Sequence, residues 1–96
     1  MKHVREKDFD EMAELFQMLA DTTRLKILKQ LFLKECCVSE LVSALGMSQS
    51  AVSHQLSSLK KTRVVKSKKV GRNVFYGLDD KHIESIFKLT LEHIQE

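Results

Sequence analysis

The chain is 96 residues long, 43% hydrophobic and 30% charged, with a formal net charge of +3. This length and balance predict one compact domain spanning residues 1–96 and exclude a second, and we expect so short a chain to gain stability as an oligomer. The first twelve residues mix both charges without an apolar run, which excludes a signal peptide or membrane span, and the adjacent Cys36 and Cys37 are poorly placed for a disulfide, so we expect a cytoplasmic protein.

The chain continues as helices separated by short turns. Apolar residues at i, i+3, i+4 and i+7 predict a first amphipathic helix through Leu19, and N-cap residue types at 21–23 precede a second helix that runs to about Leu33. A shorter stripe over 38–45 predicts a third helix, which Gly46 ends because glycine readily adopts the left-handed C-terminal conformation. Ser48 can then cap a fourth helix that runs to about Lys61.

After Lys61 the pattern changes to the β-branched residues and alternation that are typical of strands. Two such runs flank Gly71-Arg72-Asn73, which predicts a β-hairpin over about 64–78. Asp79 or Asp80 can cap a last helix over about 80–95. The predicted fold is mainly α (α+β): a winged helix-turn-helix of five helices, with the helix-turn-helix at about 38–61 and the hairpin wing before the last helix.

The charges are distributed unevenly along these elements. Residues 41–78 contain seven basic side chains and no acidic one, whereas the rest contains nine basic and thirteen acidic side chains, so a charge of +7 stands against −4. A solvated face normally mixes both signs, whereas a stretch of one sign is expected where a protein binds a polyanion. Since this stretch covers the helix-turn-helix and the wing, we expect double-stranded DNA as a partner.

The fourth helix leaves a small, polar face outward, opposite its buried side. There the Gln49 amide can contact adenine edges, serines can approach bases or phosphates, and His54 can donate to either. Basic side chains at the end of the helix and on the wing are expected to hold phosphates. The candidate DNA-binding residues are Ser48, Gln49, Ser50, Ser53, His54, Lys60, Lys61, Lys68, Lys69 and Arg72.

The last helix carries four side chains that zinc accepts as ligands: Asp80, His82, His93 and Glu96. The two histidines are eleven residues apart, about 16 Å along a helix axis, which is farther than two imidazoles can span to one ion. If the same helix of a second chain packs antiparallel, Asp80 and His82 meet the partner's His93 and Glu96, which gives two equivalent sites. Positions spaced by four and three residues, as in paired helices, support this homodimer. These seam positions are His82, Ile86, Leu89, His93 and Glu96.

Three runs of the chain, 19–28, 47–56 and 71–76, resemble the ArsR/SmtB family of bacterial metal-sensing repressors. The resemblance implies a homodimer that represses metal-efflux or resistance genes by binding an operator, an imperfect palindrome, in the apo form and releasing it when metal binds. In the zinc-sensing branch, the ligands between subunits match all four candidate positions on the last helix. The resemblance therefore implies Zn(II) as the cofactor.

Another branch of that family binds soft metals through two cysteines near the start of its third helix. Here Ser39 stands where the second thiolate would be, so we expect Cys36 and Cys37 to be structural thiols.

Two alternatives stay open beside the zinc sensor, and a third is not expected. Nitrogen and oxygen ligands also accept cobalt and nickel. Asp80 can be a helix cap, Glu96 a solvated terminal residue and the histidines polar interface residues, which would leave a metal-independent DNA-binding regulator. A metal-dependent hydrolase would need an open coordination position and a nucleophile motif, so we expect neither an enzyme nor a small organic substrate.

Overall fold

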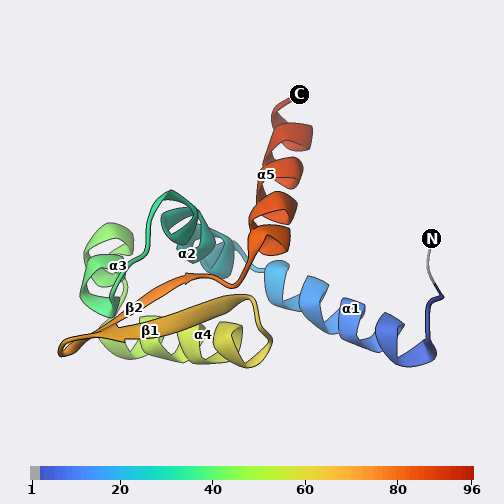
Figure 1. Cartoon of the computed structure of the whole chain (residues 1–96). Helices are drawn as coiled ribbons and strands as arrows, with labels where there is room; N and C mark the ends of the chain where they lie inside the picture. Colours follow the sequence, from blue (N-terminus) through green and yellow to red (C-terminus); the bar gives the residue numbers. More distant parts are fainter. Residues whose placement is uncertain (1–2) are drawn as a thin grey trace.

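A computed structural model describes residues 3–96, and Met1 and Lys2 of the expected domain lie outside the described residues. Its five helices and two-stranded antiparallel sheet confirm the predicted mainly α winged helix-turn-helix (Figure 1). The elements are α1 (Glu6–Leu19), α2 (Thr22–Leu33), α3 (Val38–Leu45), α4 (Gln49–Lys61), β1 (Val65–Val70), β2 (Asn73–Leu78) and α5 (Lys81–Gln95). Within this part of the chain, no helix combines the length and apolarity that a membrane span needs.

Side-chain caps start three of the helices, each at one of the residues that the sequence offered for it. Asp21 Oδ2 accepts a hydrogen bond from the backbone N–H of Arg24 at 3.0 Å, at the start of α2. Ser48 Oγ accepts one from the N–H of Ala51 at 3.1 Å, at the start of α4. Asp80 does the same for α5. Each cap satisfies a backbone donor that the first helical turn leaves without a partner.

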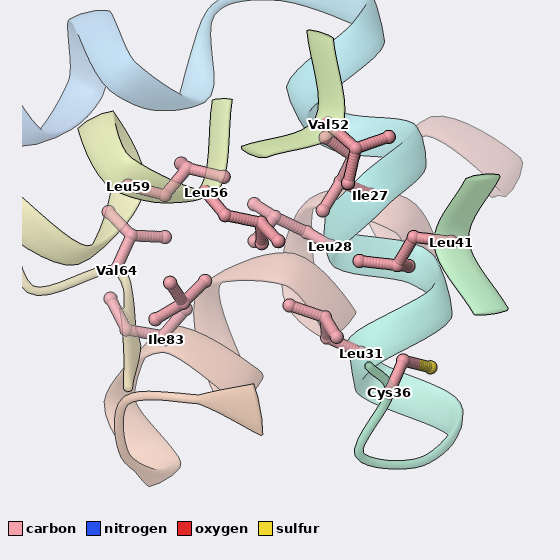
Figure 2. Packing of buried hydrophobic residues seen from close by; sticks show 11 residues of the cluster. Ile27, Leu28, Leu31, Cys36, Leu41, Val52, Leu56, Leu59, Val64 and Ile83 are labelled. Atoms are coloured by element: carbon pink, nitrogen blue, oxygen red, sulfur yellow. The ribbon is translucent and has the colours of Figure 1, made fainter. Parts of the chain in front are cut away.

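The hydrophobic core surrounds α2, whose Ile27 and Leu28 are 0% and 1% exposed. Figure 2 shows side chains from α3, α4 and α5 around these α2 residues. The inner face of α4 is therefore held against the centre of the domain, which leaves its opposite face free. The buried residues are Ile27, Leu28, Leu31, Cys36, Leu41, Val52, Leu56, Leu59, Val64, Val65 and Ile83.

Two helices project from this body, α1 at one side and α5 from the end of the hairpin (Figure 1). α1 begins before the apolar stripe that predicted it, because Asp8 accepts a hydrogen bond from the backbone N–H of Arg5 at 2.9 Å. None of its residues is buried in this chain. Its large apolar side chains that stay exposed are Phe9, Met12 and Phe16.

The wing is a regular hairpin whose strands pair from Val65 and Leu78 at the base to Val70 and Asn73 at the tip. Gly71 in the connecting turn has a φ of +63°, in the left-handed region that a side chain disfavours. A glycine at this position therefore permits the tight turn, as predicted.

The loop between α2 and α3 fastens the wing to the body. The N–H of Cys36 donates to Tyr76 O at 3.0 Å, and the N–H of Tyr76 donates to Cys36 O at 2.7 Å, so the loop pairs with the outer edge of β2. The neighbouring Glu35 lies against Gly77, where a Cβ would be 3.3 Å from its Cγ. Its carboxylate also forms an ion pair with Lys68 Nζ at 3.0 Å.

The end of α4 adopts a conformation that the sequence did not predict. The N–H of Val64 donates to Leu59 O at 2.9 Å and the N–H of Arg63 to Lys60 O at 3.1 Å, which is the Schellman arrangement of a helix end. That arrangement usually places a glycine in the left-handed region, but here Arg63 occupies it with a φ of +60°. An L residue in this conformation costs about 1–2 kcal/mol.

Candidate nucleic-acid interface and metal ligands

A three-residue turn joins the two helices of the helix-turn-helix. Gly46 ends α3 with a φ of +66°, and its N–H donates to Val42 O at 2.9 Å, while Ser48 begins α4. Leu41 of α3 and Leu56 of α4 are both fully buried in the common core. The two helices are thus fixed against each other, and the polar face of α4 is presented to solvent.

All ten candidate DNA-binding residues are exposed. Ser48 also has a structural role, since its Oγ caps α4 and lies 3.3 Å from Ser50 Oγ. Ser57, which is not among these candidates, is exposed on the same face. Its spacing of three and four residues from His54 and Ser53 indicates that position.

The basic candidate side chains form two groups, those with a polar partner in the described part of the chain and those without an ion pair there. Lys60 Nζ donates to Ser67 Oγ of the wing at 2.7 Å, and Lys68 is paired with Glu35. Within residues 3–96, Lys61, Lys69 and Arg72 form no ion pair. Residues 41–78 contain no acidic side chain, but a carboxylate still lies beside them in the folded chain, because Glu35 of the preceding loop pairs with Lys68.

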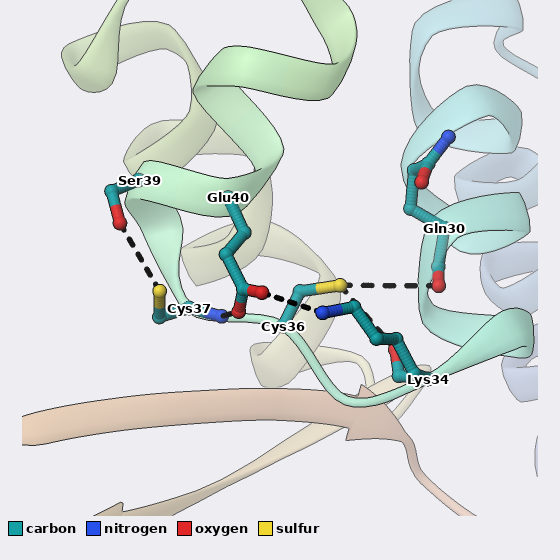
Figure 3. Close-up of polar contacts among 6 residues, drawn as sticks. All are labelled: Gln30, Lys34, Cys36, Cys37, Ser39 and Glu40. Carbon is teal, nitrogen blue, oxygen red and sulfur yellow. Dashed lines mark hydrogen bonds and ion pairs between the residues drawn. The ribbon is translucent and has the colours of Figure 1, made fainter.

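The two cysteines lie at the start of α3, as Figure 3 shows. Cys36 is buried, and burial raises the pKa of its thiol. Cys37 is half-buried, with its Sγ 3.2 Å from Ser39 Oγ. Both thiols are free, and the burial of Cys36 agrees with the expected structural role.

Glu40 ties this loop to the first turn of α3 (Figure 3). Its carboxylate accepts hydrogen bonds from Lys34 Nζ at 2.6 Å and from the backbone N–H of Cys37 at 3.0 Å. These hydrogen bonds lower the pKa of Glu40 from 4.5 to about 2, and the bond from Lys34 has the larger effect. A carboxylate with a depressed pKa stabilises the fold above its unfolded pKa and loses that contribution as the pH falls.

Replacing Glu40 by glutamine is therefore expected to lower the melting temperature at pH 7. The difference from the wild type should shrink as the pH falls from 4.5 towards about 2, because both proteins then carry a neutral side chain at this position. Thermal unfolding followed by circular dichroism over this pH range measures the effect. Lys34→Gln should reproduce much of the loss, and a difference that does not vary with pH would refute this role of the carboxylate.

Asp80 and His82 form a pair at the start of α5. Asp80 Oδ1 accepts hydrogen bonds from the N–H groups of His82 and Ile83 at 2.9 and 3.2 Å, whereas Oδ2 lies 3.3 Å from His82 Nδ1. The pKa of the Asp80 carboxyl is lowered, mainly by the hydrogen bond from the N–H of Ile83 and next by the contact with the His82 ring. The side chain of His82 is 92% exposed and that of Asp80 50% exposed, so the cap leaves one carboxylate oxygen and the imidazole accessible.

His93 and Glu96 lie at the other end of α5, and both are exposed. Among residues 3–96, no group of three or more histidine, cysteine, aspartate or glutamate side chains converges where it could hold a metal ion. One chain therefore brings together only Asp80 and His82 of the four candidate ligands.

An apolar groove of about 840 Å³ runs beside α5. Residues from the end of α1, from α2 and from α5 line it, with Phe16, Leu25 and Phe87 among them. Leu89 and Ile94, on the exposed part of α5, are 64% and 72% exposed. Exposed apolar side chains of this number on a small chain indicate an interface.

Comparison with known proteins agrees with this architecture. Residues 21–67 match the family described as "Bacterial regulatory protein, arsR family". A solution structure of a homodimeric winged helix-turn-helix DNA-binding domain from Mycobacterium bovis, described as a possible ArsR-family regulator, superposes with a TM-score of 0.90. It is 25% identical in sequence, and the match covers 100% of this chain and 92% of that one.

Two further relatives are named as transcriptional regulators. A transcriptional repressor SmtB homolog of Synechocystis sp. is 45% identical over 86 residues, which cover 90% of this chain and 65% of that protein's length. A cadmium resistance transcriptional regulatory protein CadC homolog of Staphylococcus aureus is 34% identical over 87 residues, which cover 90% of this chain and 72% of that protein. On these matches, the chain belongs to the arsR family of bacterial regulatory proteins.

Proposed function

We propose that this chain is a homodimeric transcriptional repressor whose apo form binds operator DNA and whose DNA affinity falls when Zn(II) binds to α5. The observation that carries the proposal is the placement of two accessible donor pairs at opposite ends of one exposed helix. Membership of the arsR family, with relatives named as a transcriptional repressor and a cadmium resistance regulator, supports it.

The uncovered apolar surfaces support the dimer. Of the seam positions, Ile86 is half-buried and Leu89 is exposed in the single chain. Ile86 also lines the apolar groove. Antiparallel pairing of two α5 helices would cover Leu89 and would bring Asp80 and His82 near the partner's His93 and Glu96.

The chemistry of the donors fits zinc. Two imidazoles and two carboxylates make a four-coordinate set without a thiolate, and all four side chains are accessible to a second chain. The cap at Asp80 uses Oδ1 and leaves Oδ2 beside the His82 ring, so a ligand role and the capping role are compatible. Bound zinc would supply a fixed link between the two α5 helices.

The DNA-binding role is assigned to the exposed face of α4 and to the wing. Gln49, Ser50, Ser53 and His54 would face base edges, with Ser48 at the start of the helix. The basic residues Lys60, Lys61, Lys68, Lys69 and Arg72 would neutralise phosphates. Lys61, Lys69 and Arg72 suit this role best, since their charges are unpaired within residues 3–96.

Ligation and DNA binding would be coupled through the relative placement of the two protomers. A dimer fixed by zinc would hold its two α4 helices where they no longer match successive major grooves. The ring nitrogen of His93 that does not bind the metal could donate to a backbone carbonyl at Thr62 or Arg63, at the end of α4. Coupling of this kind is reciprocal, so DNA would weaken zinc binding by the same factor.

The test is fluorescence anisotropy on a DNA duplex that the apo protein itself selects from a random-sequence pool, hereafter the selected duplex. Zinc is expected to lower the affinity by about 5–150-fold, the usual range of such coupling, and a chelator should restore it. Parallel titrations with cobalt, nickel and cadmium compare the metals. An affinity that no metal changes would contradict the sensor and leave a metal-independent regulator, whereas release by cobalt or nickel alone would change the identity of the metal.

A further inference from the structure

One side-chain hydrogen bond joins the beginning of α2 to the middle of α4. Arg24 Nε donates to Gln55 Oε1 at 3.0 Å, between residues that are 31 positions apart and both half-buried. The backbone of Arg24 is itself fixed by the Asp21 cap. The guanidinium is therefore held at a defined place beside α4.

Gln55 lies on one flank of α4, between its buried and its outward faces. At 100° per residue, Gln55 and Lys60 fall on opposite sides of the buried stripe formed by Val52, Leu56 and Leu59. The bond from Lys60 to Ser67 ties the second flank to the wing. α4 is thus braced by a polar contact on each side of its apolar contacts.

These polar contacts bear on the rotation of α4 about its own axis. Apolar packing fixes which face of α4 lies against the core. Because hydrophobic burial is non-directional, it does not by itself select the exact rotation of the helix within that face. A rotation of about 20° moves a point on the surface of a helix by about 2 Å. Base reading by hydrogen bonds requires donors and acceptors within a few tenths of an ångström of their proper places.

We propose that Arg24 is a positioning residue for DNA reading. Its bond to Gln55 sets the rotation of α4 about its own axis and so determines which outward side chains reach base edges. This inference rests on the proposed DNA-binding function. It assigns to Arg24 a part in sequence specificity without a contact to DNA.

The experiment compares binding to the selected duplex with binding to a scrambled duplex of the same length and composition. Arg24→Ala is expected to lower affinity for the selected duplex about tenfold, the size of one lost base contact, and to change affinity for the scrambled duplex less than twofold. Gln55→Ala should have the same effect, and the double variant should lose no more than either single one. Lys88→Ala removes the same charge on the outer side of α5 and should leave the preference unchanged.

A conservative variant separates positioning from loss of folding. Gln55→Glu keeps an acceptor for Arg24, so it should weaken binding to both duplexes through its charge while retaining the preference between them. Equal losses on both duplexes for Arg24→Ala, with the slope of log affinity against log salt smaller by about one, would show a phosphate contact and overturn the inference. A wild-type preference that Arg24→Ala retains would also overturn it. A wild type without any sequence preference would instead overturn the proposed function.

Discussion

Replacing Leu89 by glutamate is expected to convert the dimer into monomers and to lower affinity for the selected duplex about 100-fold or more. Leu89 is 64% exposed in the single chain and lies at the centre of the α5 seam, where antiparallel pairing would place a carboxylate in an apolar interface. A monomer reads one half-site, so it loses the gain of about 100-fold to 10,000-fold that linked binding provides. Sedimentation velocity measures the mass, and anisotropy measures the affinity.

Lys88→Gln is the matched control for this variant. It changes the net charge by the same amount at the adjacent residue, which is exposed on the side of α5 away from the seam. It should remain dimeric, with an affinity within a few-fold of the wild type because only one distant charge has changed. A Leu89→Glu protein that stays dimeric and binds normally would show that the α5 seam is not the interface.

Replacing His93 or His82 by alanine is expected to abolish the response to zinc while leaving the affinity of the apo protein for the selected duplex unchanged. Each substitution removes a nitrogen ligand from both proposed sites of the dimer, and neither removes the Asp80 cap of α5. Competition with a chelating dye measures zinc binding independently of DNA. Zinc-driven release that survives in both variants would show that the ligands lie elsewhere.

Heterodimers test whether the ligands come from two chains. A dimer with His82→Ala in one chain and His93→Ala in the other loses both nitrogen ligands from one site and keeps the second site intact. This heterodimer can be purified through a different tag on each chain. It should bind about one zinc ion, whereas the wild-type dimer should bind about two and the homodimer of each single variant should bind none tightly. Ligands drawn from a single chain would leave no intact site in this heterodimer, so an absence of zinc binding would contradict the arrangement.

The local features of the fold were predictable because short-range chemistry determines them. The caps at Asp21, Ser48 and Asp80 are among the predicted ones, Gly46 is left-handed as predicted, and Gly71 lies in the predicted turn. Each of these features depends on residues within a few positions of itself. The exposure of the candidate residues on α4 followed equally from helical periodicity.

The contacts between distant segments were not predictable from one sequence. Arg24 and Gln55, or Glu35 and Lys68, meet only once the chain has folded, and no local pattern marks either pair. Arg63 was missed for a different reason, because a glycine would normally indicate its conformation. The four ligands on α5 are still predictions, since they require a second chain and one chain brings only Asp80 and His82 together.

The backbone pairing of Cys36 with Tyr76 bears on how the proposed sensor would change its fit to DNA. An isolated two-stranded hairpin is only marginally stable and would bend easily, but this one is fastened to the loop before α3 by that pairing and to α4 by Lys60. These contacts tie the wing to both helices of the helix-turn-helix. In the proposed sensor, we therefore expect a change in operator fit to come mainly from a rotation of whole protomers about their shared axis.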